Sequence, residues 1–160
     1  MPEAVVNTSP LQYLFQAGLL DLLPKLYSGA TVPEAVSKEI EAGRSLGIML
    51  PVLSELKWLK VQRIRRTGLL ALAVDLGPGE REVLALATEL PDVVAVLDDT
   101  LARQSARLLG IRYTGTLGVL LKAKAAGHLS RVSPALEKLQ DLGFHLDPGT
   151  RTSVIRLAGE

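Results

Sequence analysis

One stretch of the chain limits the possible folds more than any other. Val93 to Leu97 is apolar without interruption and is directly followed by Asp98 and Asp99. A strand that is apolar on both faces is typical of the inside of a parallel sheet, because helices cover both faces there. Helical patterns stand on either side of this strand, over Glu80 to Leu90 and Thr100 to Leu109. The segment therefore predicts an α/β fold around a buried strand.

The remaining elements alternate in the same way. Further strands are expected at Ala4 to Val6, Gly29 to Val32, Trp58 to Ile64 and Ile111 to Tyr113. Further helices are expected over 11–23 with a break at Gly18, and over 33–42, 46–56, 69–76, 117–126 and 134–142, with a last helical or strand-like piece over 150–157. This alternation indicates βαβ units on a parallel sheet. No linker rich in Pro, Gly or Ser divides the 160 residues, so we predict a single domain over 1–160.

The composition excludes several classes of protein. The absence of cysteine rules out disulfide scaffolds, thiolate metal sites and cysteine nucleophiles. The formal net charge is +1, so binding of nucleic acid needs a local patch of charge rather than an overall field. The start of the chain lacks the basic region of a secretory signal, and polar residues interrupt the uncharged stretch 4–20 too often for a membrane span. We therefore expect a soluble, cytoplasmic protein.

Polar side chains follow three of the predicted strands. Asn7 follows the first strand, Asp98 and Asp99 follow the apolar one, and Thr114 to Thr116 follow the strand at 111–113. In an open α/β sheet, ligands bind outside the carboxyl ends of the strands. These groups are therefore expected on one rim of the sheet.

Two further acids stand where a purely solvated carboxylate would not. Glu80 opens its predicted helix on the same face as Val83 and Leu84. Glu39 lies at the margin of the apolar stripe of its own helix, beside Ile40. A charge directed at a core is costly unless something compensates it, and a divalent cation does so. The simpler explanation for Glu80 is that the helix dipole stabilises an acid in the first turn.

Together these residues supply oxygen ligands. The set consists of Asn7, Glu39, Glu80, Asp98 and Asp99. Mg²⁺ and Mn²⁺ prefer oxygen ligands, whereas zinc prefers His or Cys, so the set predicts an Mg²⁺ or Mn²⁺ site. One residue of the Asp98–Asp99 pair is expected to cap the following helix instead. His128 and His145 have no metal-ligand spacing and are expected in surface positions or loops. An acidic metal site of this kind activates water and holds a phosphodiester.

Five motifs in this order resemble those of PIN-domain proteins. They are the segments 5–11 (VVNTSPL), 32–36 (VPEAV) with Glu39, 76–80 (LGPGE), 97–99 (LDD) with Ala102 and Arg103, and 114–118 (TGTLG). The chain looks most like a prokaryotic branch of PIN-like proteins related to the toxin ribonucleases of toxin–antitoxin pairs. The resemblance implies a three-layer α/β/α fold with a short parallel sheet, and metal-dependent cleavage of single-stranded RNA in an acidic cleft.

The resemblance also implies roles for particular residues. It makes Asn7, Glu39, Glu80 and the Asp98–Asp99 pair the catalytic group, with Asn7, Glu80, Asp98 and Asp99 as the metal ligands. Thr114 and Thr116 would lie beside the site and help to hold phosphate. Members of the family usually have Asp where this chain has Asn7, and an amide oxygen contributes no charge to a cation.

Three functions follow in order of preference. The first is a metal-dependent, toxin-like endoribonuclease whose activity is attenuated at Asn7. The second is a catalytically silent PIN-like module that binds RNA or a protein partner. The third is a small-molecule or nucleotide-binding α/β protein, against which stands the absence of a G-x-G-x-x-G motif and of a P-loop lysine.

Partner surfaces are predicted from the charged and apolar patterns. Arg103 and Arg107 lie one helical turn apart, opposite the side of Leu101, Leu108 and Leu109, and form either a solvated helix face or a stripe that contacts RNA phosphates. Leucines between residues 11 and 26 are either plainly buried or partly exposed as a homodimer face. An antitoxin protein is a further expected partner. Aromatic residues make up only 4% of the chain, which leaves little material for stacking bases.

Overall fold

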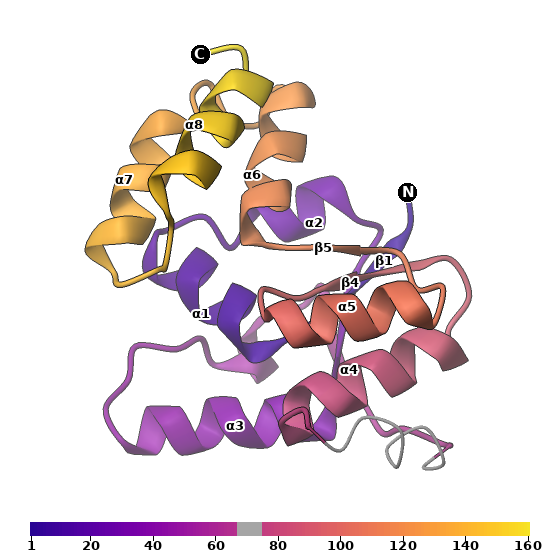
Figure 1. The fold of residues 1–160 in the computed structure, drawn as a ribbon. Helices are drawn as coiled ribbons and strands as arrows, with labels where there is room; N and C mark the ends of the chain where they lie inside the picture. Colours follow the sequence, from indigo (N-terminus) through magenta and orange to yellow (C-terminus); the bar gives the residue numbers. More distant parts are fainter. Residues whose placement is uncertain (67–74) are drawn as a thin grey trace.

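The computed structural model describes residues 1–66 and 75–160, and these contain a five-stranded parallel sheet with the order β3-β2-β1-β4-β5 (Figure 1). The strands are β1 (Glu3–Val6), β2 (Ala30–Pro33), β3 (Leu59–Gln62), β4 (Val93–Val96) and β5 (Tyr113–Thr114). β1 pairs with β2 on one side and with β4 on the other. The α/β fold predicted from the apolar run at 93–97 is confirmed.

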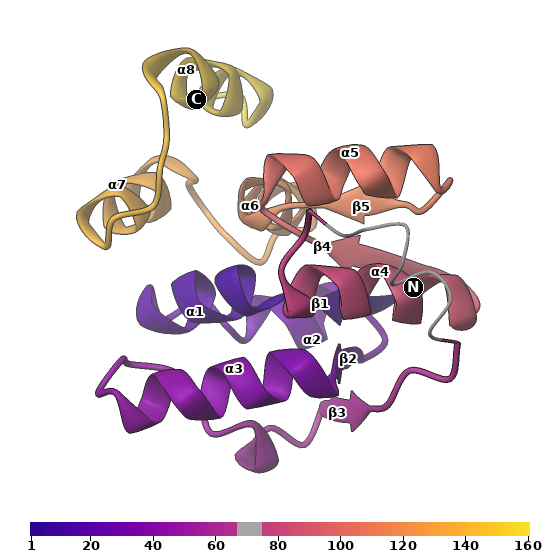
Figure 2. The same cartoon turned by 60° about the horizontal axis from the view of Figure 1, so that its bottom comes forward.

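Helices lie on both sides of this sheet. They are α1 (Thr8–Gln16), α2 (Leu22–Leu26), α3 (Glu34–Ser45), α4 (Pro78–Glu89), α5 (Thr100–Leu108), α6 (Thr116–Ala125), α7 (Ser133–Asp141) and α8 (Pro148–Leu157). In Figure 1, α4 and α5 lie on one side of the sheet and α2 and α6 lie on the other, which gives the expected three-layer arrangement. Figure 2 shows α1 and α3 side by side, extending from the ends of β1 and β2. None of the described helices is long and apolar enough to cross a membrane.

The core is built from the strands and the helix faces turned toward them. Val5 and Val6 of β1, Val96 of β4 and Leu86 of α4 are completely buried, as is Leu120 of α6 on the other side. The leucines between residues 11 and 26 also belong to this core, with Leu19 partly buried and the others buried. Of the two alternatives for these leucines, plain burial is the one that the structure shows, because the core uses them. A homodimer stays a prediction, and these leucines do not provide its surface.

The helix predicted over 46–56 is wrong. α3 ends at Ser45, and Gly47 has a φ of 86°, a left-handed conformation that stops a helix. Pro51 lacks the N–H that a continuing helix would need. The segment is therefore irregular up to a short 3₁₀ helix, η1 (Leu53–Glu55). Of the helix predicted over 69–76, residues 69–74 lie outside the described part of the chain.

The carboxylate of Glu160 fastens α7 to α6. It accepts hydrogen bonds from Lys124 Nζ at 2.9 Å, from Val132 N at 2.7 Å and from Ser133 Oγ at 2.7 Å, and the side chain is only 8% exposed. The Lys124 ammonium and these donors hold the pKa of Glu160 well below its usual range. The start of α7 is thereby fixed, and α7 leads into the loop 142–147, which reaches the candidate site.

Candidate active site

Several helices begin at the carboxyl edge of the sheet. α1 follows β1 after Asn7, α3 follows β2 without a gap, and α6 follows β5 after Gly115. α5 begins just after β4. The first turn of α4 lies against α3, where Gly79 N donates to Glu39 Oε1 at 3.0 Å. The first turn of a helix carries unpaired amide groups and a partial positive charge. This edge therefore favours carboxylates and phosphates.

Asp98 is held by three donors from two helices. Its Oδ1 accepts from Thr116 N at 2.8 Å, and its Oδ2 accepts from Thr116 Oγ1 at 2.7 Å and from Ser9 Oγ at 3.3 Å. Thr116 is completely buried at the start of α6. Because both oxygens of Asp98 are engaged, the carboxylate is fixed in orientation between α1 and α6.

Asp99 has the role of a helix cap. It is the N-cap of α5, and its Oδ2 accepts from Ala102 N at 2.8 Å. Asp99 is exposed, whereas Asp98 is partly buried. Of the two neighbouring acids, Asp99 therefore caps its own helix, and Asp98 is the one held from outside it.

Glu39 and Glu82 cap each other's helices. Glu39 of α3 binds the amide of Gly79 in the first turn of α4, and its Oε2 accepts from the Thr8 hydroxyl of α1. In return, Glu82 Oε1 of α4 accepts from Ala35 N in the first turn of α3, at 3.1 Å. Neither helix has a side-chain cap from its own N-cap residue. These bonds supply the missing caps and join α3 to α4.

Replacement of Glu39 tests this capping role. Glu39→Ala leaves the Gly79 amide without its acceptor and is expected to lower the free energy of unfolding by about 1–2 kcal/mol in urea denaturation. Glu39→Gln keeps an acceptor and is expected to retain most of that stability. The control is Glu41→Ala, an exposed position on the same helix, with an expected change within about 0.5 kcal/mol. Equal stability of Glu39→Ala and Glu41→Ala would contradict the role.

Asn7 and Glu80 meet at the start of α1 and α4. Asn7 is the N-cap of α1, but its side chain makes no capping bond and instead donates from Nδ2 to Glu80 Oε1 at 3.3 Å. Asn7 is 2% exposed, and its Oδ1 is buried with no hydrogen-bond partner among the described residues. A Cβ on Gly79 would lie 2.7 and 2.8 Å from the Glu39 oxygens and 3.0 Å from Asn7 Oδ1. Glycine at this position therefore lets both side chains approach α4.

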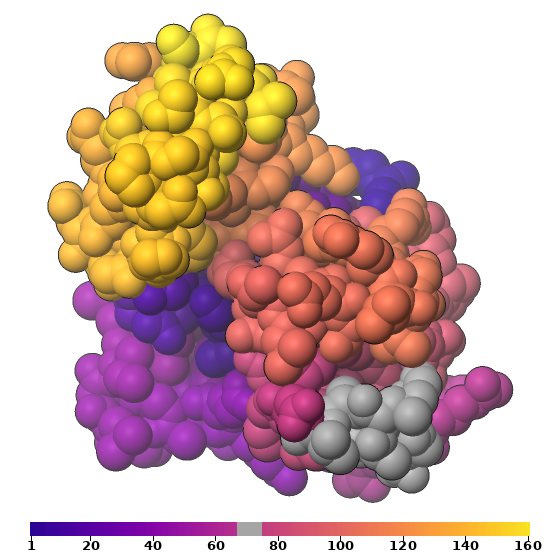
Figure 3. Space-filling view, in the orientation of Figure 1, coloured from indigo at the N-terminus to yellow at the C-terminus, as the bar shows by residue number. Residues whose placement is uncertain are grey.

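These residues border a cleft of about 410 Å³. It is lined by Asn7, Ser9, Tyr13, Glu80, Asp98, Asp99, Gly143, Phe144 and His145. In Figure 3, the indigo surface of α1 is seen between the yellow C-terminal helices and the orange surface of α5. The cleft brings together Asn7, Glu80, Asp98 and Asp99, whereas Glu39 lies behind them against Gly79.

The oxygen groups of the cleft fit a hard cation. Within 1–66 and 75–160, no three carboxylates or imidazoles lie close enough together to hold an ion on their own. Mg²⁺ does not need such a group, because it usually keeps several waters and binds one or two carboxylates together with substrate phosphates. Asn7 Oδ1 is a buried acceptor without a donor in the described chain, and it lies beside Glu80. A cation would satisfy this atom.

Of the two predicted basic residues, Arg103 lies next to the cleft, in the wall of a recess that Asp98 also lines, and Arg107 is on the same helix. The Arg103 guanidinium lies over the ring of Tyr113, 5.5 Å from its centroid, and Arg107 Nη2 donates to the Tyr113 hydroxyl at 3.0 Å. On the same helix, the predicted apolar side of Leu101, Leu108 and Leu109 is exposed. The buried residues are Ala102 and Ala106. α5 thus packs through small side chains, which brings it close to the sheet.

Sequence reasoning missed the contribution of the loop 142–147. Phe144 and His145 line the cleft together with Tyr13, whose ring meets that of Phe144 edge-on at 5.0 Å. His145 is exposed, as expected for a loop residue, but it lies beside Asp98 and Asp99 in the cleft wall. This loop follows a helix, so the rule of strand ends gives no signal for it. Although aromatic residues are few, the fold brings two of them, Tyr13 and Phe144, into this cleft.

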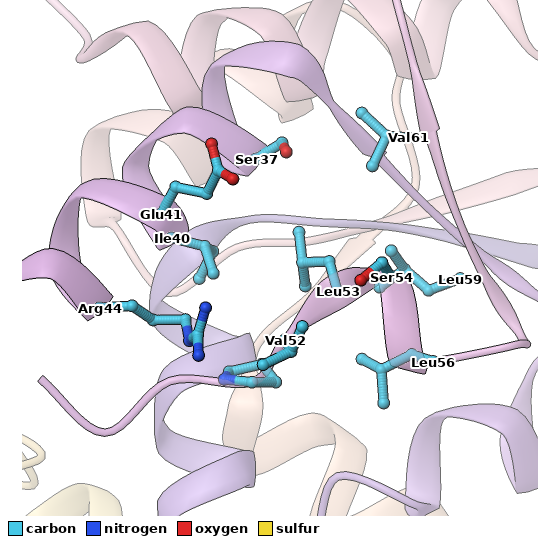
Figure 4. Close-up of a pocket in the computed structure, with 11 residues that line it drawn as sticks. Ser37, Ile40, Glu41, Arg44, Val52, Leu53, Ser54, Leu56, Leu59 and Val61 are labelled. Carbon is cyan, nitrogen blue, oxygen red and sulfur yellow. The ribbon is translucent and has the colours of Figure 1, made fainter.

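A separate hollow of about 260 Å³ lies between α3 and the segment from η1 to β3 (Figure 4). Its wall combines apolar side chains, such as Ile40, Leu53 and Leu59, with the charged Glu41 and Arg44 of α3. In the described part of the chain, none of the predicted site residues lines this hollow. This hollow is therefore separate from the predicted site.

Comparison with known proteins agrees with this arrangement. A family model described as a PIN domain matches residues 3–160, nearly the whole chain. No curated protein matches the chain.

Proposed function

Because the chain belongs to the PIN-domain family, whose members are in general metal-dependent nucleases, we propose that it is an endoribonuclease that cuts single-stranded RNA with Mg²⁺ or Mn²⁺. The observation that carries the proposal is the shared cleft of Asn7, Glu80, Asp98 and Asp99. Asn7 lies just before α1, Glu80 in the first turn of α4, and Asp98 and Asp99 between β4 and α5, so only the folded chain assembles them.

The roles in this proposal follow from the contacts. Asn7 Oδ1, Glu80 and Asp98 would hold the cation, which supplies Lewis acidity toward the phosphodiester and lowers the pKa of water. Asp99 lines the same cleft but is used to cap α5, so it is the weakest member of the expected ligand set. Thr116 is buried and donates to Asp98, so it positions that carboxylate rather than touching RNA. Glu39 supports the site by fixing the first turn of α4.

RNA phosphates need positive charge beside this acidic group. Arg103, which lies over the ring of Tyr113, supplies it in a recess that Asp98 also lines, and Thr114 offers a hydroxyl there. Arg107, which donates to the Tyr113 hydroxyl, adds a second positive charge on the same helix. The amide groups at the start of α5 and α6 add a further positive potential. Contacts of this kind position a strand without reading its sequence.

The amide of Asn7 makes this an attenuated enzyme. It brings no charge to the cation, so the chain needs a higher metal concentration than a site with a carboxylate in that place. A toxin-like role, an antitoxin protein as partner and a homodimer belong to the same proposal.

One set of observations favours a second candidate, a catalytically silent module that binds RNA or a protein. Both oxygens of Asp98 are already hydrogen-bonded to Ser9 and Thr116, and Asn7 replaces a carboxylate. A site used only for binding has no need of a free carboxylate at this position.

Cleavage of a labelled single-stranded RNA separates the two. We expect the purified protein to cut this RNA with Mn²⁺, and cleavage to stop in excess EDTA. A duplex of the same sequence is expected to stay intact. Binding without cutting at any Mn²⁺ concentration would favour the silent module. Cutting that survives EDTA would contradict the metal-dependent mechanism.

A further inference from the structure

A second recess adjoins the cleft of the candidate active site. Its volume is about 480 Å³, and it lies between the start of α5, the start of α6 and the loop 142–147. The residues of interest in its wall are Asp98, Arg103, Tyr113, Thr114, Phe144 and His145. Asp98, Phe144 and His145 also line the cleft, so the two spaces meet at these side chains.

The wall of this recess combines aromatic surface with polar groups. Phe144 is partly buried and is fixed edge-on against Tyr13, with ring planes at 90°. Arg103 is held over Tyr113, and Thr114 and His145 bring a hydroxyl and an imidazole. An aromatic face with a few placed polar groups is typical of sites for small, flat ligands.

Resting on the proposed function, we propose that this recess binds the nucleobase next to the phosphodiester that is cut. A base stacked on Phe144 would leave its phosphate near Asp98, where the recess opens into the cleft. Arg103 would then neutralise the backbone on the α5 side. Only an unpaired base can turn out of its stack to enter such a space, so the recess favours single-stranded RNA as the substrate.

Binding without cutting tests this inference. A short oligouridine carrying one 2-aminopurine is titrated with the protein in EDTA, and both affinity and quenching of 2-aminopurine are measured. We expect the wild type to bind and quench, and Phe144→Leu to bind about ten-fold more weakly with little quenching, because stacking is lost. Phe144→Tyr keeps a ring and is expected to retain both. The control is Arg44→Ala, an exposed position on α3 away from the recess.

A second variant, Arg103→Ala, tests the inference even if Phe144→Leu does not fold. Arg103 is exposed, so Arg103→Ala leaves the core intact, and it is expected to weaken binding several-fold and to reduce its salt dependence. Binding and quenching as in the wild type by either folded variant would overturn the assignment, as would failure of the wild type to quench. Quenching that needs Phe144 in a protein that never cuts RNA with Mn²⁺ would support the recess and refute the nuclease.

Discussion

Asp98→Asn is expected to lower the rate of RNA cleavage about a thousand-fold, the largest effect of any single change. The carboxylate charge lies in the cleft, where the proposed function needs it to hold the cation and offset charge in the reaction. The amide has the same shape. Its oxygen still accepts from Thr116 N, and its nitrogen can donate to the hydroxyls of Thr116 and Ser9, which accept as well as donate. Melting temperature is measured beside the rate to show that the fold is kept.

Asp92→Asn is the matched control for this substitution. Asp92 lies just before β4, at the opposite edge of the sheet, and pairs with Arg112 at 2.7 Å on the surface. Exposed pairs of this kind contribute little, so rate and stability are expected to stay near those of the wild type. If Asp98→Asn cut as fast as Asp92→Asn, Asp98 would not serve the chemistry, and the silent module would be favoured.

Asn7→Asp is expected to destabilise the metal-free protein and to strengthen its binding of Mn²⁺. The side chain at this position is 2% exposed and donates to Glu80, so the change places a buried carboxylate against a partly buried one. Without metal we expect a loss of about 3 kcal/mol in the free energy of unfolding. A cation joins the two charges, so Mn²⁺ is expected to bind at least about ten-fold more tightly and to raise the melting temperature more than in the wild type.

A double variant isolates the contact between the two positions. Glu80→Gln on the Asn7→Asp background removes the second charge and is expected to restore most of the metal-free stability, while the gain in Mn²⁺ affinity disappears. Calorimetric titration with Mn²⁺ and melting in EDTA measure the two effects separately. Unchanged Mn²⁺ affinity in Asn7→Asp would remove this residue from the proposed ligand set.

The rim of the sheet could be predicted because strand ends follow a topological rule. Val93 to Leu97 marks a buried parallel strand, and in such a sheet the residues after each strand meet at one edge. Asn7, Asp98 and Asp99 do line one cleft, and Thr116 lies against Asp98. The capping of α4 by Glu39 could not be predicted in this way, because it depends on how two helices pack and no local sequence pattern contains that packing.

Two parts of the molecule could not be predicted for physical reasons. The apolar residues at 46–56 suit a helix, but Gly47 and Pro51 make the backbone of that segment irregular. Phe144 and His145 reach the cleft through the packing of α8 on α6 and the contacts of Glu160 with α6 and the start of α7, a tertiary arrangement that leaves no periodic trace in the sequence.

Two contacts between distant parts of the chain affect when the cleft can form during synthesis. They are the mutual capping of α3 and α4 and the hydrogen bonds from Thr116 to Asp98. A nascent chain still on the ribosome has no complete cleft until residue 116 has emerged, and its wall is finished only with Phe144 and His145. Under the proposed function, a nascent chain therefore gains the complete RNA-cutting cleft only after residue 145 has left the ribosome.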